Sequence, residues 1–231
     1  MIGVEERAPK AGAEEVEVLQ SLFPRDCAVA IRTEPGRISD LFDSEMACIR
    51  DAVPERQAEF AAGRACVRQA LRSVGAPPYA ILTDKFRAPV WPQGVIGSIS
   101  HCPGLCVAVI AHRLMGNAVG VDVETNDRLK EGVRDAVATP DERHALDNLQ
   151  RALRCDPLKL LFVIKEAVFK LYYPATRHFL DFQHARIRLD PETGAFEAEL
   201  ADSSAPSAIG LRRFSGRFGV TGGYLMAGGV I

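Results

Sequence analysis

The sequence lacks the features of membrane, secreted and nucleic-acid-binding proteins. No apolar run in its 231 residues approaches the length of a membrane span, and the N-terminus shows no signal-peptide pattern. The formal net charge is only −2, from 28 basic and 30 acidic residues, so there is no overall basic field to attract nucleic acid. The apolar content of 47% is enough for the core of one large or two small domains.

Cysteine spacing excludes a disulfide framework and a structural zinc site. The chain has six cysteines, of which Cys102 and Cys106 form the only close pair, and no second pair accompanies it. We therefore expect the cysteines to be reduced and mostly buried small apolar residues, which suits a cytoplasmic protein.

Two common catalytic signatures are also missing. No Gly-x-x-x-x-Gly-Lys-Ser/Thr segment occurs, which argues against a phosphotransferase of the phosphate-loop kind. Ser98 and Ser100 lie in Gly-Ser-Ile-Ser-His, but no Gly-x-Ser-x-Gly elbow surrounds them. A serine hydrolase is therefore a poor interpretation.

Helical and strand patterns are mixed along the whole chain, which predicts an α+β fold. Thr139 and Pro140 have the residue types of a helix N-cap and first helical position. Residues 1–16 are expected to be a frayed tail, and a Pro/Gly-rich loop is expected to lead to a corner at Ser100 and His101. The predicted strands are 28–32, 105–112, 119–123, 185–189, 195–200, 210–214 and 224–231. The predicted helices are two within 44–74 separated at Pro54, one beginning at 140, and one from 157 to about 173, before Pro174.

Two short segments, 120–124 and 165–170, carry groups that would suit a reaction on a pyrophosphate. Asp122 and Glu124 are two apart in a Val-rich run, so on a strand they share a face. Glu166 and Lys170 are four apart in a helical pattern, so they share a helix face, with Lys165 beside them. Mg²⁺ takes carboxylates, waters and phosphate oxygens, and lysines can meet the remaining phosphate charge. Taken alone, each segment is more typical of a solvated strand end or a salt-bridged surface helix.

A third segment, Gly-Ser-Ile-Ser-His at 97–101, precedes these two. Upstream lie Arg-Gln-Ala-Glu-Phe at 56–60, Gly-Arg-Ala-Cys-Val-Arg at 63–68 and Trp-Pro at 91–92. In this order the set resembles the 4′-phosphopantetheinyl transferase superfamily, and within its surfactin-type enzymes the enterobactin synthase component D branch. The resemblance covers residues 56–173.

The resemblance implies a fold of two pseudo-symmetric α/β halves, with the active site at their junction near residues 113–116. The halves would be 1–115, with the coenzyme A nucleotide contacts, and 116–231, with the metal and catalytic residues. The implied activity is Mg²⁺-dependent transfer of 4′-phosphopantetheine from coenzyme A to a serine of an apo acyl or peptidyl carrier protein, releasing adenosine 3′,5′-bisphosphate. Siderophore or secondary-metabolite biosynthesis would be the setting, and we expect a cytoplasmic monomer.

The resemblance also implies roles for individual residues. Arg56, Arg64 and His101 would grip the nucleotide end of coenzyme A, where guanidinium suits bidentate phosphate binding. Ser100, Lys165 and Lys170 would contact coenzyme A as well. Asp122, Glu124 and Glu166 would hold the metal, and Glu166 and Lys170 would be catalytic. The alternatives left open are that Glu166 is the general base or only a metal ligand, and that the chain is a catalytically silent coenzyme A or carrier-protein binding module.

Two further points stay open at this stage. Thr83 stands where relatives often have a basic residue, so the coenzyme A contacts of the 83–92 loop are undefined. The identity of the carrier protein is undefined too. An intact acidic trio argues against the silent module, because binding alone does not require three clustered carboxylates.

Overall fold

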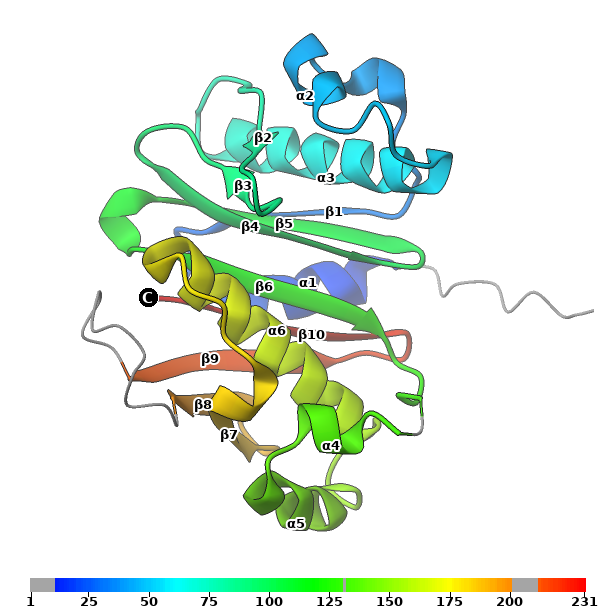
Figure 1. Ribbon diagram of the computed structural model, residues 1–231, viewed down its shortest axis with the longest axis vertical. Helices are drawn as coiled ribbons and strands as arrows, with labels where there is room; N and C mark the ends of the chain where they lie inside the picture. The colour runs from blue at the N-terminus through cyan, green and yellow to red at the C-terminus, as the bar shows by residue number, and fades with distance from the viewer. Residues whose placement is uncertain (1–10, 131, 201–211) are drawn as a thin grey trace, which may run out of the picture.

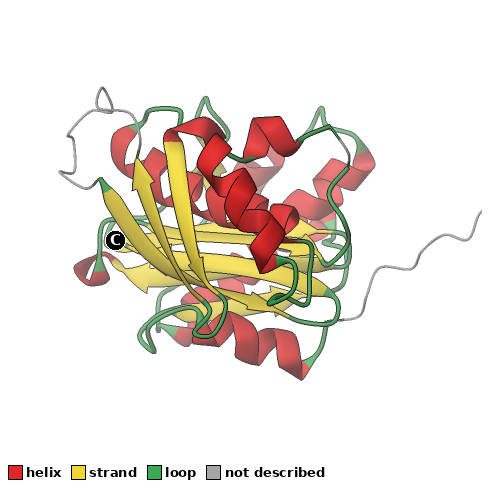
Figure 2. Ribbon diagram, turned by 90° about the horizontal axis from the view of Figure 1, so that it is seen from below, coloured by secondary structure: helices red, strands yellow, loops and turns green. Residues whose placement is uncertain are grey.

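Two antiparallel sheets lie side by side and carry helices on both faces (Figures 1 and 2). The computed structural model describes residues 11–130, 132–200 and 212–231. The smaller sheet has the order β1 (Ala28–Arg32), β5 (Leu105–His112), β4 (Val95–Cys102). The larger has the order β6 (Val119–Thr125), β10 (Tyr224–Val230), β9 (Arg213–Val220), β8 (Ala195–Leu200), β7 (Ala185–Asp190). A short separate pair consists of β2 (Leu82–Thr83) and β3 (Pro89–Val90).

The helices divide between the two faces. The α-helices are α1 (Ala13–Ser21), α2 (Asp43–Ala47), α3 (Pro54–Ser73), α4 (Arg134–Val137), α5 (Pro140–Leu149) and α6 (Pro157–Thr176). Short 3₁₀ turns are η1 (Ile38–Asp40), η2 (Arg113–Met115) and η3 (Phe182–His184). The predicted mixture of helix and sheet is confirmed. No helix in the described ranges is long and apolar enough to cross a membrane.

Strand β6 shows how alternation builds both a core and a site. Val119, Val121 and Val123 are fully buried in a core that α1 covers and that includes residues of both sheets. The intervening Asp122 and Glu124 must therefore face the other side, toward α6. The predicted shared strand face of these two carboxylates is confirmed.

The seam between the two sheets is held by side chains. Strands β4 and β6 are neighbours but form no backbone ladder with each other. Instead, Ser98 Oγ accepts a hydrogen bond from the Val121 amide at 3.1 Å, and Ser100 Oγ accepts one from the Val123 amide at 3.3 Å. Both serines are buried, so these hydroxyls satisfy amides that would otherwise lack partners. The two serines of the Gly-Ser-Ile-Ser-His segment thus join the sheets.

Gly120 lets α6 pass close over β6. A Cβ atom at this position would collide with the carbonyl oxygen of Ala167 and with Leu171. The other side of the contact is a fully buried apolar face of α6 that includes Val163, Ala167 and Leu171. Because the two backbones approach here, side chains on the adjoining turn of α6 are placed over Asp122, two residues further along β6.

Two predicted helices differ from the structure. The first helix expected within 44–74 is only the five-residue α2, followed by turns up to Val53. Helix α6 was expected to end before Pro174, but it continues to Thr176. Pro174 stands close to the helix end, and the turn is closed by the Arg177 amide bonding to the Tyr173 carbonyl at 2.8 Å, with Arg177 in a left-handed conformation at φ 59°.

Three other expectations need correction. Part of the expected N-terminal tail is α1, whose Leu19 is fully buried, while residues 1–10 lie outside the described ranges. The expected corner at Ser100 and His101 lies within strand β4. The strand expected at 210–214 begins at Arg213 and runs to Val220, and residues 210–211 are outside the described ranges.

Candidate active site

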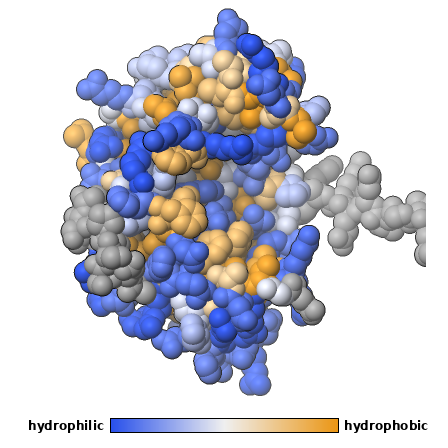
Figure 3. Space-filling view, viewed as in Figure 1, coloured by the Kyte–Doolittle hydropathy of each residue, from blue (hydrophilic) through white to orange (hydrophobic). Residues whose placement is uncertain are grey.

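A cavity of about 710 Å³ opens beside the seam, between the two sheets' long helices. It is bordered by α3, β4, β6, the segment around β3, and the C-terminal part of α6. On this face hydrophobic residues gather over the middle of the molecule, with hydrophilic residues around them (Figure 3). Elements between residues 56 and 179 therefore form one concave surface large enough for a small-molecule substrate.

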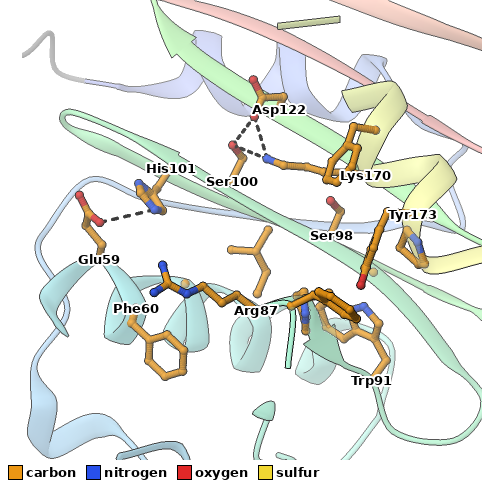
Figure 4. Close-up of a pocket in the computed structure, with 18 of the residues that line it drawn as sticks. Glu59, Phe60, Arg87, Trp91, Ser98, Ser100, His101, Asp122, Lys170 and Tyr173 are labelled. Carbon is orange, nitrogen blue, oxygen red and sulfur yellow. Dashed lines mark hydrogen bonds and ion pairs between the residues drawn. The ribbon is translucent and has the colours of Figure 1, made fainter. Parts of the chain in front are cut away.

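A lysine, a serine and an aspartate form the polar floor of this cavity (Figure 4). Lys170 Nζ lies 2.7 Å from Asp122 Oδ1 and 3.0 Å from Ser100 Oγ, and the Ser100 hydroxyl donates to Asp122 Oδ1 at 2.7 Å. Asp122 is only 5% exposed, and its Oδ2 is buried with no hydrogen-bond partner among the described residues. One oxygen of this buried carboxylate is therefore satisfied by Ser100 and Lys170, and the other has an unused acceptor.

The other two acidic residues of the predicted set lie near Asp122 without lining the cavity. Burial, and then repulsion from Asp122, raise the pKa of Glu166, while Lys170 opposes the shift. The pKa of Glu124 is raised by the same two causes, with Lys159 Nζ 3.9 Å from Glu124 Oε2 opposing it. The Asp122 carboxylate thus raises the cost of a negative charge on both Glu124 and Glu166.

Arg64 is a buried cation that faces the cavity. It is 5% exposed, its Nε donates to the Ile81 carbonyl at 2.8 Å, and its guanidinium lies 3.8 Å from the centre of the Phe60 ring. Burial lowers the pKa of Arg64 to about 10, and its Nη2 is buried with no hydrogen-bond partner in the described part of the chain. An unpartnered guanidinium nitrogen is costly to bury, so this position is suited to an acceptor supplied by a ligand.

Arg56 and His101 meet at another side of the cavity. Arg56 Nη1 is 2.8 Å from His101 Nε2, and because guanidinium can only donate, the histidine nitrogen accepts. Burial lowers the pKa of His101 below its ordinary value, and Glu59 opposes this shift. The structure therefore brings together Arg56, Arg64, Ser100, His101, Asp122 and Lys170 as residues of one cavity.

Lys165 does not join them. Its side chain is fully buried, and its ammonium donates to Glu142 Oε2 at 2.7 Å and to the carbonyls of Val137 at 2.8 Å and Phe182 at 2.7 Å. All three of its donors are therefore used within the protein. Lys165 and Lys170 are five residues apart on α6, a rotation of about 140°, so Lys165 points away from the face that carries Lys170.

Comparisons with known proteins agree with this geometry. Residues 44–111 match the 4′-phosphopantetheinyl transferase N-terminal domain, and residues 118–225 match the 4′-phosphopantetheinyl transferase superfamily. The chain is 34% identical over 225 residues to 4′-phosphopantetheinyl transferase Npt of Nocardia iowensis, covering 94% of each chain. It is 41% identical over 181 residues to 4′-phosphopantetheinyl transferase Svp of Streptomyces mobaraensis, covering 78% of this chain and 72% of the relative.

Enterobactin synthase component D of Salmonella typhimurium is 36% identical over 128 residues, covering 54% of this chain and 51% of the relative. The chain belongs to the 4′-phosphopantetheinyl transferase superfamily. The resemblance inferred from the sequence motifs is confirmed.

Sequence reasoning missed several residues in the cavity of this transferase, among them Tyr173 and Glu59. Tyr173 is 8% exposed, and its ring stacks on Phe169 at 5.6 Å between ring centres. Its hydroxyl is buried and has no hydrogen-bond partner among the residues that the structure describes. Its spacing from Lys170, one turn of helix, was a usable signal. Glu59 lies 3.6 Å from His101 Nε2, a contact between α3 and β4 that no sequence spacing reveals.

Proposed function

We propose that this protein transfers the 4′-phosphopantetheine group of coenzyme A to a serine hydroxyl of an apo acyl or peptidyl carrier protein, releasing adenosine 3′,5′-bisphosphate. Family membership supports the reaction class. One observation in the structure carries the proposal further. Three buried side-chain atoms within the described ranges lack hydrogen-bond partners, Arg64 Nη2, Asp122 Oδ2 and Tyr173 Oη, and all three residues line the cavity. Such a cavity is suited to a ligand with both donors and acceptors.

The nucleotide end of coenzyme A is assigned to the basic residues. Arg56, Arg64 and His101 would contact its phosphates, and Ser100 would orient Lys170 beside them. Fixing the pyrophosphate in this way places the reacting phosphorus within reach of the incoming serine, so the reaction gains from proximity rather than from a covalent intermediate.

The acidic residues are proposed to hold Mg²⁺. Hard carboxylate oxygens are the donors this ion prefers, and the unpartnered Asp122 Oδ2 and the raised pKa values of Glu124 and Glu166 support a site for a cation. In the described ranges these side chains do not form a ready-made ligand cluster, so the substrate would complete the coordination. When bound, the ion would polarise the pyrophosphate and offset its charge.

Proton transfer and charge balance are assigned to α6. Glu166 is the proposed general base for the attacking serine hydroxyl, and burial that raises its pKa brings its basicity closer to neutral pH. Lys170 would stabilise or protonate the leaving phosphate, whose charge grows as the bond breaks. The Lys165 ammonium donates hydrogen bonds to acceptors on α4, α5 and η3. We therefore assign Lys165 to holding α6 in place rather than to contact with coenzyme A.

Further parts of the proposal concern organisation. The first family match ends at residue 111 and the second begins at residue 118. This gap supports a division of the chain into halves 1–115 and 116–231. Six free cysteines are consistent with a cytoplasmic setting, and a monomer acting in siderophore or secondary-metabolite biosynthesis is proposed.

The test is to incubate the protein with coenzyme A, Mg²⁺ and a panel of apo carrier proteins, and to weigh each carrier by mass spectrometry. We expect a mass increase of one phosphopantetheine group on at least one carrier, absent when the metal is chelated. The matched control is Asp122→Asn, which keeps the shape of the side chain and should abolish the increase. Coenzyme A binding without modification of any carrier would favour the silent binding module.

A further inference from the structure

Glu59 is a carboxylate placed among the cations of the cavity and has no part in the roles above. It lies on α3 one turn after Arg56, and its side chain is 43% exposed. Its Oε2 is 3.1 Å from Arg56 Nη1 and 3.6 Å from His101 Nε2. Figure 4 shows it pointing toward the His101 ring. A carboxylate at this position weakens the positive potential that an anion would meet.

Glu59 is positioned to compete for Arg56. Within the described ranges, it is the only carboxylate in ion-pair contact with Arg56 and the only one within 4 Å of a His101 ring nitrogen. Arg56 in turn donates to His101, so the three side chains form one closed group on the wall of the cavity. In this arrangement the carboxylate occupies an anion position that the Arg56 guanidinium offers, and the His101 nitrogen accepts from the same guanidinium.

We propose that Glu59 is an internal counter-ion that competes with a phosphate group of coenzyme A for Arg56. The inference rests on the proposed function. A phosphate and the Glu59 carboxylate on the same guanidinium repel each other, so the contact between Arg56 and Glu59 must weaken when the substrate binds. The exposed side of Glu59 allows the displaced carboxylate to move into solvent.

The consequence is a weaker affinity of the protein for both coenzyme A and adenosine 3′,5′-bisphosphate. Coenzyme A and the adenosine bisphosphate product carry the same phosphates at this end, so the competing carboxylate weakens both. An interaction changed equally in substrate and transition state alters KM more than kcat. Weaker retention of the product also shortens the time for which it blocks the site after transfer.

The experiment measures the Kd of coenzyme A and of adenosine 3′,5′-bisphosphate by calorimetry for the wild-type protein and for Glu59→Gln. We expect the variant to bind both about fivefold tighter, in the range that partly exposed charge pairs produce. The matched control is Glu55→Gln, an exposed acid one turn earlier on α3, which removes the same charge from the same helix and should leave both Kd values near wild type. Glu59→Ala should change affinity in the same direction as Glu59→Gln.

A helix-surface ion pair with no effect on the ligand would behave differently. In that case Glu59→Gln would have a lower denaturation midpoint than the wild type, because the ion pair is lost, and both Kd values would be unchanged or higher. That result would overturn the proposal. In an Arg56→Ala background most of the gain from Glu59→Gln should vanish, because the two substitutions act on one contact. If the wild-type protein binds neither nucleotide, the proposed function fails, and inorganic pyrophosphate then serves as the anion: equal affinity of the wild type and Glu59→Gln for pyrophosphate would refute the counter-ion role.

Discussion

At the scale of single residues, Glu166 has two candidate jobs that can be separated. Glu166→Gln keeps the shape and one oxygen acceptor but removes the charge and nearly all basicity. We expect kcat to fall by roughly a hundredfold or more, the usual size of a general-base contribution. If Glu166 is the base, excess Mg²⁺ will not restore the rate and a higher pH will restore part of it. Recovery with Mg²⁺ at constant pH would show instead that Glu166 is chiefly a metal ligand.

His101 gives a residue-scale prediction about pH and stability. Burial lowers its pKa, so the folded protein takes up this proton less readily than the unfolded chain does. The stability associated with neutral His101 is therefore complete above the unfolded pKa of roughly 6.5 and is lost as the pH falls through the lower folded pKa. In His101→Gln, urea unfolding at about pH 7.5 and about pH 5 should show a smaller loss of stability than in the wild type. His112→Gln, at an exposed histidine, should keep the wild-type loss.

A substitution of Lys165 tests whether this buried cation contributes to coenzyme A binding or to the stability of the folded chain. Its ammonium and the Glu142 carboxylate are both almost fully buried. Removing one member leaves the other charged and unpaired, so Lys165→Met should lower the free energy of unfolding by about 3–5 kcal/mol. At a temperature where the variant is folded, we expect its KM for coenzyme A to match the wild type. A variant with normal stability and a raised KM would return Lys165 to the coenzyme A contacts.

At the scale of elements, the packing of α6 on β6 depends on one glycine. Gly120→Ala places a methyl group against the Ala167 backbone and Leu171, so we expect the free energy of unfolding to fall by more than about 2 kcal/mol. Gly222→Ala is the matched control, because a Cβ there meets no atom within 4 Å. Its stability should stay within about 0.5 kcal/mol of wild type in the same denaturant titration. Equal stability of the two variants would contradict the close approach.

Elements with a strong local signal could be predicted from the sequence, and elements decided by distant contacts could not. The capping residue Thr139 identified the start of α5, because its side chain accepts a hydrogen bond from the Glu142 amide of the first turn. Strand β4 was missed because its small and polar residues are explained only by its partners, the β6 amides that bond to Ser98 and Ser100. Pro174 misled the prediction for the same reason: local preference ends a helix there, while buried Tyr172, Tyr173 and Thr176 hold the last turn in place.

In the candidate site, too, local patterns could be predicted from the sequence and contacts between distant elements could not. Asp122 with Glu124, and Glu166 with Lys170, could be placed on shared faces by the periods of strand and helix. The contact of Asp122 and Lys170 with Ser100 across the seam could be expected only from the family resemblance. Spacing within one element does not show which other elements it contacts. The buried pairing of Lys165 with Glu142 could not be predicted, since it depends on where α5 packs.

At the scale of the whole molecule, the cavity takes its lining from both family-matched regions, so a ligand there should bind only the folded chain. Coenzyme A at about 100 times its Kd should stabilise the protein by about 2.7 kcal/mol, by mass action alone. We expect thermal unfolding to shift upward with coenzyme A, and to shift less with the same concentration of pantetheine, which lacks the nucleotide. An unfolding temperature that ignores coenzyme A would place its binding site elsewhere.

The alternation of apolar and acidic residues along β6 links the proposed metal site to the correct pairing of this strand. Asp122 pairs with Ala227 and Val121 with Gly228 on β10, and this register keeps the valines in the core beneath α1. A slip of one residue would turn Asp122 and Glu124 into that apolar core and expose the valines. Burying unpaired carboxylates is far costlier than burying small apolar residues, so the slipped pairing is strongly disfavoured. The acids that are proposed to hold the metal therefore also penalise misfolded pairings, and neutral replacements would weaken that protection even where they leave the native structure unchanged.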